Sequence, residues 1–257
     1  MAERTVVWTQ DEELLHALAA GSTSPTRTVE SSNTTPFASF LTTLAFRSAL
    51  PLLAGSPVRA DDAIIGEVEF EIGGLWPSSR ALRVSGSVAG PWDLGSMAII
   101  RVDQSFLGDD GWLGNVTLSI YLPGQGNFGG KPPRRVPRAP LPRTEPRRIP
   151  VTIADNAALL YRLLGDRNPL HTNPQAGPAI LHGLLGVASV ERALEDELGA
   201  RLTALRCRLN RPLWTGELAE LEVWPNPEWT PLRLSARGEE AWTVASARLS
   251  ANAALGA

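Results

Sequence analysis

The pattern of hydrophobic and polar positions occurs twice along the chain. Residues 14–25 and 158–169 each contain an apolar stretch of helical period that is followed by glycine, a polar turn and proline. Residues 68–88 and 205–225 each alternate between apolar and polar side chains, which is typical of half-buried strands. Each half is therefore predicted to contain a short helix, a loop, a long helix and several strands, and this shared order indicates a duplicated unit.

Two long helices are predicted from the spacing of apolar residues. In the first half, residues 35–55 have helical period. In the second half, the helix is predicted to begin near Gly183 and to end at Gly199, because glycine commonly follows the last turn of a helix. The apolar residues of this second helix recur at spacings of three and four and form one stripe: Leu184, Val187, Val190, Leu194 and Leu198.

The predicted fold class is α+β. We expect a long helix wrapped by an antiparallel sheet in each half, and the two sheets can pair their edges into one continuous sheet, which protects edge strands. The expected parts are residues 1–122, a connection at residues 123–150, and residues 151–257. The connection contains eight prolines and four glycines, which preclude a regular helix or a central strand.

The connection also contains GQGNFG, which matches the dinucleotide-binding pattern GxGxxG. That pattern binds phosphate between a strand and the N-terminus of a helix. The sequence GKPPRRVP follows here and cannot form a helix, so we reject a cofactor site. Arg134 and Arg135 of this stretch are expected either to be solvated or to contact the phosphates of coenzyme A or the acidic face of a carrier protein.

Composition limits the partners and the compartment. The 257 residues carry a net charge of −3, which argues against nucleic acid as the main partner. The N-terminus lacks the apolar core of a signal peptide, and residues 37–55 contain Arg47 and Pro51 and make a poor membrane span. Cys207 is the single cysteine, which excludes an internal disulfide, and its alternating surroundings predict a buried strand. We expect a cytoplasmic protein.

Residues 165–171, GDRNPLH, place Asp166 and His171 five positions apart in a polar loop. Glycine, asparagine and proline form turns readily, so one interpretation is a turn that merely ends a helix. The other interpretation is chemical. Two titratable groups near one water can share the removal and the delivery of a proton, and Pro169 limits the freedom of the loop that holds them.

The run YRLLGDRNPLHTNPQA, followed by GPAILHGLLG, resembles the signature of the MaoC-like hydratases, which include the R-specific enoyl-CoA hydratases. The detailed resemblance covers residues 161–186, and the duplicated layout extends it loosely to most of the chain. Members of this family have hotdog folds, and some are double hotdogs with an intact motif only in the second half. The chain resembles that double form.

The resemblance implies roles for individual residues. Asp166 and His171 are implied to be the catalytic pair, and Gly183 is implied to donate its backbone N–H to the enolate oxygen. A helix N-terminus suits that role because its N–H groups are unpaired and its dipole end is positive. His182 is expected to bind substrate or to orient the loop, and Asn168 to bind substrate or to fix the turn.

The first half is expected to be catalytically inactive. Ser22 and Arg27 stand where the second half has its acid and its histidine, and neither can perform the proton transfers. Phe40 and Leu41 replace the histidine–glycine pair at the start of the long helix. His16 lies on the predicted short helix, and we expect it to be structural.

The leading functional hypothesis is a hydro-lyase that reversibly converts an enoyl thioester into an (R)-3-hydroxyacyl thioester, linked to coenzyme A or to an acyl carrier protein. Ten residues separate His171 from His182, fewer than is typical of long-chain hydratases, which favours a specialised biosynthetic dehydratase. The alternatives are a non-catalytic acyl-binding hotdog or dehydratase subunit, and a hotdog thioesterase.

Few other partners are expected. No cofactor is implied, and three scattered histidines without a cysteine cluster predict no metal site. We expect neither nucleic acid nor a membrane as a partner. A homodimer of double hotdogs is one expected assembly.

Overall fold

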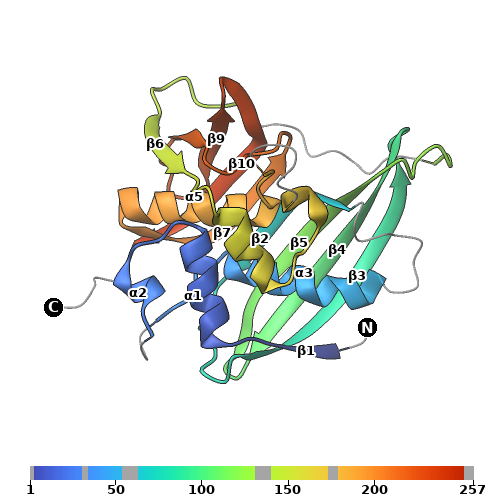
Figure 1. The fold of residues 1–257 in the computed structure, drawn as a ribbon, viewed down its shortest axis with the longest axis horizontal. Coiled ribbons are helices and arrows are strands. Elements are labelled where there is room, and N and C mark those ends of the chain that lie inside the picture. Colours follow the sequence, from blue (N-terminus) through green and yellow to red (C-terminus); the bar gives the residue numbers. More distant parts are fainter. Residues whose placement is uncertain (1–2, 31–33, 54–62, 131–139, 173–178, 252–257) are drawn as a thin grey trace.

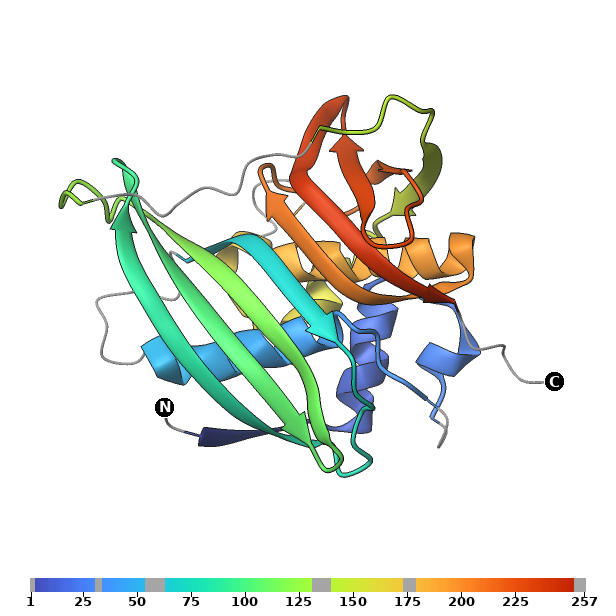
Figure 2. The same ribbon diagram turned by 180° about the vertical axis from the view of Figure 1, so that it is seen from behind.

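The computed structural model describes residues 3–30, 34–53, 63–130, 140–172 and 179–251. Their strands form one antiparallel sheet of ten strands in the order β1-β3-β4-β5-β2-β7-β10-β9-β8-β6. Figures 1 and 2 show this sheet from its two sides, with the helices gathered on one face. Within the described ranges, no helix is long and apolar enough to cross a membrane.

Both halves contain the same kinds of element. The elements of the first half are β1 (Glu3–Val7), α1 (Gln10–Ala19), α2 (Pro25–Thr28), α3 (Phe40–Leu53), β2 (Ile64–Ile72), β3 (Ala81–Asp93), β4 (Met97–Gly108) and β5 (Gly111–Pro123). The elements of the second half are β6 (Arg147–Thr152), α4 (Ala157–Tyr161), two short 3₁₀ helices η2 (Arg162–Leu164) and η3 (Pro169–His171), α5 (Gly183–Leu198), β7 (Ala200–Leu209), β8 (Leu218–Val223), β9 (Thr230–Ala236) and β10 (Glu239–Ala251).

The halves join where β2 pairs with β7 in antiparallel register, with Val68 opposite Cys207. Outward from this pair, the first half continues as β5, β4, β3 and β1, and the second half continues as β10, β9, β8 and β6. The strand order is therefore the same in both halves. The prediction of an α+β fold with two helix-wrapped sheets paired into one continuous sheet is confirmed.

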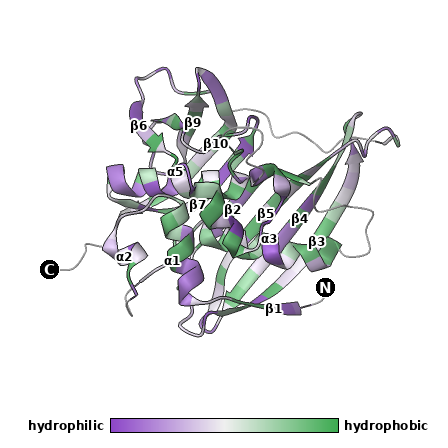
Figure 3. Cartoon of the chain, viewed as in Figure 1, coloured by the Kyte–Doolittle hydropathy of each residue, from purple (hydrophilic) through white to green (hydrophobic). Residues whose placement is uncertain are grey.

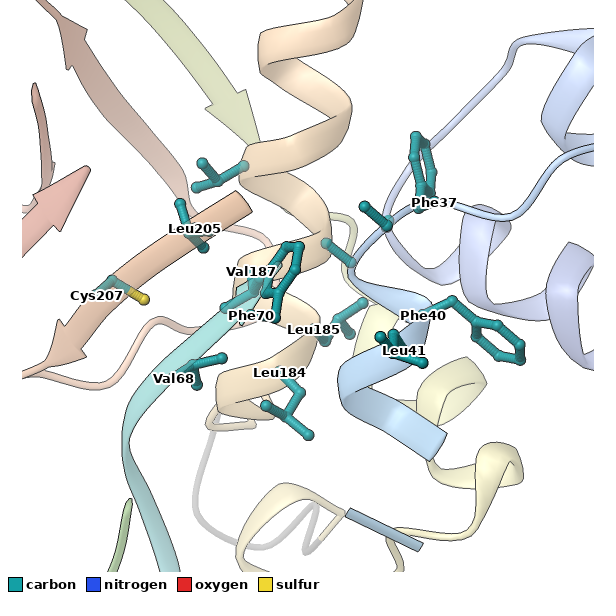
Figure 4. Close-up of a cluster of buried hydrophobic side chains, with 14 of the residues drawn as sticks. Phe37, Phe40, Leu41, Val68, Phe70, Leu184, Leu185, Val187, Leu205 and Cys207 are labelled. Atoms are coloured by element: carbon teal, nitrogen blue, oxygen red, sulfur yellow. The ribbon is translucent and has the colours of Figure 1, made fainter. Parts of the chain in front are cut away.

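The core lies between the sheet and the two long helices. Figure 3 shows hydrophobic and hydrophilic residues alternating along the strands, which places one side of each strand against the helices. Figure 4 shows the centre of the core, where α3, α5 and the paired strands contribute Phe40, Leu41, Leu184, Val187, Val68, Phe70, Leu205 and Cys207. Burial raises the pKa of the Cys207 thiol, as is usual for a cysteine that packs rather than reacts.

Helix α5 has the predicted bounds. It begins at Gly183, and Gly199 follows its last residue in the left-handed conformation, with φ of 60°. Glycine adopts this conformation without a steric penalty, which explains why the helix ends there.

Strands take up both ends of the expected connection. Strand β5 ends at Pro123, and β6 begins at Arg147 and pairs with β8 at the end of the sheet. Pro150 is tolerated in β6 because an edge strand has one side whose N–H groups need no partner strand. Arg134 and Arg135 lie outside the described residues.

A buried carboxylate of α5 ties the two halves together. Glu191 accepts the backbone N–H of Ala38 at 2.7 Å and that of Ser39 at 2.8 Å, immediately before α3. The Glu191 side chain is fully buried. Four residues further along α5, Glu195 forms a largely buried ion pair with Arg27 of the first half. Its carboxylate oxygen lies 2.6 Å from a guanidinium nitrogen of Arg27. The start of α3 is therefore capped by α5.

Replacing Glu191 by alanine should lower the free energy of unfolding by about 3 kcal/mol or more, because each buried N–H left without an acceptor costs roughly 1–3 kcal/mol. Urea denaturation would measure the change. Asp196→Ala is the matched control, since that carboxylate lies half-exposed on the same helix and pairs with Arg192 at 3.3 Å. The control should stay within about 0.5 kcal/mol of the wild type. Equal stabilities for the two variants would contradict the role of Glu191.

Candidate active site

The GDRNPLH segment is a well-defined turn that follows α4 and η2. Gly165 ends η2 with φ of 116°, a conformation that side-chain-bearing residues rarely adopt. Asn168 then caps η3, with its Oδ1 accepting the N–H of Leu170 at 3.0 Å. Asp166 Oδ1 accepts the N–H of Asn168 at 3.2 Å. These local bonds fix the direction of the chain between the acid and the histidine.

His171 is held by one ring nitrogen. Its Nδ1 lies 2.9 Å from the carbonyl oxygen of Ile180, which immediately precedes the segment that leads into α5. Because a carbonyl can only accept, Nδ1 is the donor. In the neutral form of the ring, the proton then lies on Nδ1, and Nε2 can accept a proton.

His182 contacts both members of the predicted pair. Its Nε2 donates to the backbone carbonyl oxygen of Asp166 at 3.2 Å, and its ring stacks on His171 with centroids 3.9 Å apart. Burial, together with the charge of His171, lowers the pKa of His182 to about 3. His182 is therefore a neutral ring that joins the start of α5 to the loop.

Asp166 has the electrostatic character of a proton acceptor. Burial raises the pKa of its carboxyl group, while the N–H of Asn168 and the charge of His171 act in the opposite direction. A carboxylate with a raised pKa takes up a proton more readily near neutral pH. One carboxylate oxygen of Asp166 and one imidazole nitrogen each of His171 and His182 all lie within 4.8 Å of one another.

These three side chains line a cavity of about 380 Å³. The remainder of the lining is mainly apolar and comes from both halves, as shown by Phe46, Ile65, Leu209, Leu213 and Trp242. A small polar cluster at the end of an apolar cavity is the usual composition of a small-molecule site.

Gly183 borders this cavity at the start of α5. A Cβ atom at this position would lie 2.7 Å from Cδ1 of Leu209, so the close approach requires glycine. The N–H of Gly186 bonds to the carbonyl of His182 at 3.0 Å, and the N–H groups before it have no acceptor within the helix. Such groups can stabilise an oxygen on which negative charge develops.

The expectation of scattered histidines was wrong. His171 and His182 stack on each other, and together with Asp166 they make a group that could hold a metal ion. Each ring commits one nitrogen to a backbone carbonyl, and the two ring planes are inclined by 26° to each other.

The first half has a different set of partners at the corresponding positions. The guanidinium of Arg27 pairs with Glu195 and donates to the carbonyl oxygen of Thr35, and Ser22 is buried. His16 packs against Phe40 with ring centroids 5.2 Å apart, and burial with the charge of Arg27 lowers its pKa to about 3. Arg27 is thus committed to an ion pair and His16 to the core.

Sequence reasoning missed the residues that reach the site from a distance. Trp242 comes from β10, and Phe46 and Ile65 come from the first half. Thr43 of α3 hydrogen-bonds to the hydroxyl of Tyr161 at 2.8 Å, and Tyr161 packs against His182. Of these residues, Tyr161 belongs to the motif, whereas no local motif marks Trp242, Phe46, Ile65 or Thr43.

Residues 138–228 match the family model of the MaoC like domain. The chain is 32% identical over 187 residues to the peroxisomal multifunctional enzyme type 2 of Drosophila melanogaster, covering 67% of this chain and 31% of that protein. It is 38% identical over 118 residues to 3-hydroxyacyl-thioester dehydratase Y of Mycobacterium tuberculosis, covering 41% of each chain. A solved MaoC-like dehydratase from Phytophthora capsici has a TM-score of 0.82 at 19% identity, covering 99% of this chain and 96% of that chain.

The duplicated sheet wrapped around two long helices defines a double hotdog. Residues 138–228 therefore belong to the MaoC like domain family, as the motif resemblance predicted. It spans less than two thirds of the length of either curated relative.

His16 and His182 should remain neutral between pH 5 and 8, because burial lowers both pKa values to about 3. Both rings ionise near 6.5 in the unfolded chain, so both should reduce stability as the pH falls below about 6.5. NMR of the ring C–H resonances would follow each histidine, assigned with the variants His16→Gln and His182→Gln. A His182 resonance that titrates with a midpoint above pH 5 would contradict the neutral stacked ring.

Proposed function

We propose that the chain catalyses the reversible addition of water to an enoyl thioester, giving a 3-hydroxyacyl thioester. One observation carries the proposal: Asp166 and His171 lie close together in the lining of one mainly apolar cavity, which also reaches the N-terminus of α5 at Gly183. The relatives named as a 3-hydroxyacyl-thioester dehydratase and a multifunctional peroxisomal enzyme support this reaction class.

The reaction needs a base, an acid and an anion site. A water oxygen forms a bond to C3, its proton passes to one member of the Asp166–His171 pair, and a proton is delivered to C2. As water adds, negative charge moves to the thioester oxygen, where the N–H at Gly183 stabilises the enolate. Dehydration reverses each transfer, so the pair returns to its starting protonation state in either direction.

The two other predicted site residues are assigned to holding the loop. Asn168 caps η3, and His182 bonds to the backbone of Asp166 and stacks on His171. Each contact orients one of the two proton-transferring groups. The expected handle of the substrate is coenzyme A or an acyl carrier protein. A cytoplasmic location and a homodimer of double hotdogs stay predictions.

Crotonyl-CoA with a free-thiol reagent would test the reaction class. Hydration removes the enoyl absorbance without releasing thiol. Release of thiol would instead identify a thioesterase, and the absence of both signals across a panel of coenzyme A and carrier-protein thioesters would favour a non-catalytic acyl-binding protein.

Asp166→Asn and His171→Gln should each lower kcat by at least about 100-fold, the usual scale for a general acid or base. Both changes preserve size, so the circular dichroism spectrum should match that of the wild type. Ser22→Ala is the control, since it changes the corresponding position of the first half. The assignment fails if either variant in the second half keeps most of its activity while remaining folded.

A series of buried side-chain contacts, called the column below, runs from α3 of the first half to the catalytic pair. Thr43 of α3 bonds to Tyr161 at 2.8 Å, the Tyr161 ring lies 4.8 Å from that of His182, and His182 stacks on His171. Tyr161 is 2% exposed, so the hydroxyl has no access to bulk water. The column transmits the position of α3 to the imidazole of His171.

Thr43→Val and Tyr161→Phe should each lower kcat several-fold with little change in KM, because they disturb the orientation of His171 and leave the substrate cavity intact. Thr43→Ser should restore kcat, since it keeps the hydroxyl that bonds to Tyr161. Steady-state kinetics on crotonyl-CoA would measure both parameters. An unchanged kcat in both variants, or no rescue by serine, would show that the column has no part in catalysis.

A further inference from the structure

The apolar end of the cavity closes within one helical turn of Gly183. Gly183 and Gly186 both line the cavity, and they lie on the same side of α5, three residues and about 4.5 Å apart along the helix axis. Val190 is the next residue on this side, and it is fully buried in the core rather than part of the lining. The cavity therefore extends only a short way beyond the proposed anion site.

Trp242 and Leu213 form the wall at this closed end. The side chain of Trp242 is 1% exposed and borders the cavity from β10. A Cβ atom at Gly186 would lie 3.3 Å from Cδ1 of Leu213 and 3.6 Å from Cζ2 of Trp242. Both side chains therefore pack closely against the backbone of α5 at Gly186.

The size and polarity of the space indicate what can fill it. At about 380 Å³, the cavity lies near the lower end of the roughly 300–1,000 Å³ that is usual for small-molecule sites. Apolar side chains such as Ile65, Leu209 and Trp242 make up most of its lining. The polar lining residues are Asp166, Asn168, His171, His182, Asn210 and Arg211. The closed end suits a short hydrocarbon chain.

We propose that Trp242 is the floor of an acyl subsite and selects short, unbranched acyl thioesters, and that Gly186 keeps this subsite open. The placement of the thioester rests on the proposed function, with its oxygen at Gly183 and its reacting carbons beside Asp166 and His171. From that position, a linear chain runs along the glycine side of α5 and meets the indole ring. Longer chains are excluded by the volume of the indole.

Binding of saturated acyl-CoAs tests the floor separately from the chemistry, because butyryl-, octanoyl- and dodecanoyl-CoA cannot be hydrated. Isothermal titration calorimetry should show that the wild type binds dodecanoyl-CoA more weakly than butyryl-CoA. In Trp242→Ala, the ratio of these two Kd values should change by at least about tenfold in favour of dodecanoyl-CoA. One methylene group in an apolar pocket already changes the discrimination between two ligands by about 10- to 200-fold.

Gly186→Ala should have the opposite effect. Its methyl group enters the subsite, so the Kd for octanoyl-CoA should rise by about tenfold while that for butyryl-CoA stays within about twofold. Alanine also favours the helix interior over glycine, so this variant should remain folded even if Trp242→Ala does not. Trp224→Ala is the matched control: this tryptophan is buried in the same half, donates to the carbonyl of Thr144 at 2.8 Å and is not part of the lining.

The outcomes separate the two proposals. The proposed role of Trp242 is contradicted if Gly186→Ala leaves the chain-length preference unchanged. It is also contradicted if a folded Trp242→Ala has the same preference as Trp224→Ala. Both conclusions hold whether or not the protein hydrates enoyl thioesters. If binding follows the expected order but the wild type hydrates none of crotonyl-, octenoyl- and dodecenoyl-CoA, the proposed function fails and the acyl subsite stands.

Discussion

The antiparallel pairing of β2 with β7 is the contact on which the rest of the structure depends. It runs from Glu67 opposite Arg208 to Glu71 opposite Ala204, and the first of these pairs also forms a salt bridge of 2.6 Å. Each half alone would expose this strand edge. Joining the edges satisfies their backbone groups and places α3 and α5 side by side on one face of a single sheet. The cavity at the start of α5 can then take its lining from both halves.

Burial determines the chemistry of the titratable groups along this seam. Removal from water lowers the pKa of His16 and His182 and raises that of Asp166, because in each case the charged form loses hydration. The same effect has different uses. His16 is surrounded by aromatic rings and belongs to the core, whereas Asp166 and His182 border an open space that can admit water and a ligand.

The two halves have divided their roles. The first half uses Arg27 and the N–H groups before α3 to bind carboxylates of α5, which fixes the helices relative to each other. It also supplies Phe46 and Ile65 to the cavity and Thr43 to the column behind His182. A half that lacks the acid and the histidine of the motif therefore has clear physical reasons to be retained: it completes the sheet, encloses the apolar space and supports the loop.

The sequence by itself determined the local features. Periodicity gave the bounds of α5 and the alternation of the strands, and duplication of that order predicted the joined sheet, because these patterns follow from which side of each element faces the core. The resemblance of the motif to a known signature brought Asp166, His171 and Gly183 together as candidates. Only the tertiary structure decided that His182 stacks on His171, that Glu191 caps α3, that Thr43 supports Tyr161 and that Trp242 closes the cavity. Apart from the two histidines, which are eleven positions apart, these contacts join residues far apart in the chain. Their distances depend on sheet register and helix packing, which no local pattern specifies.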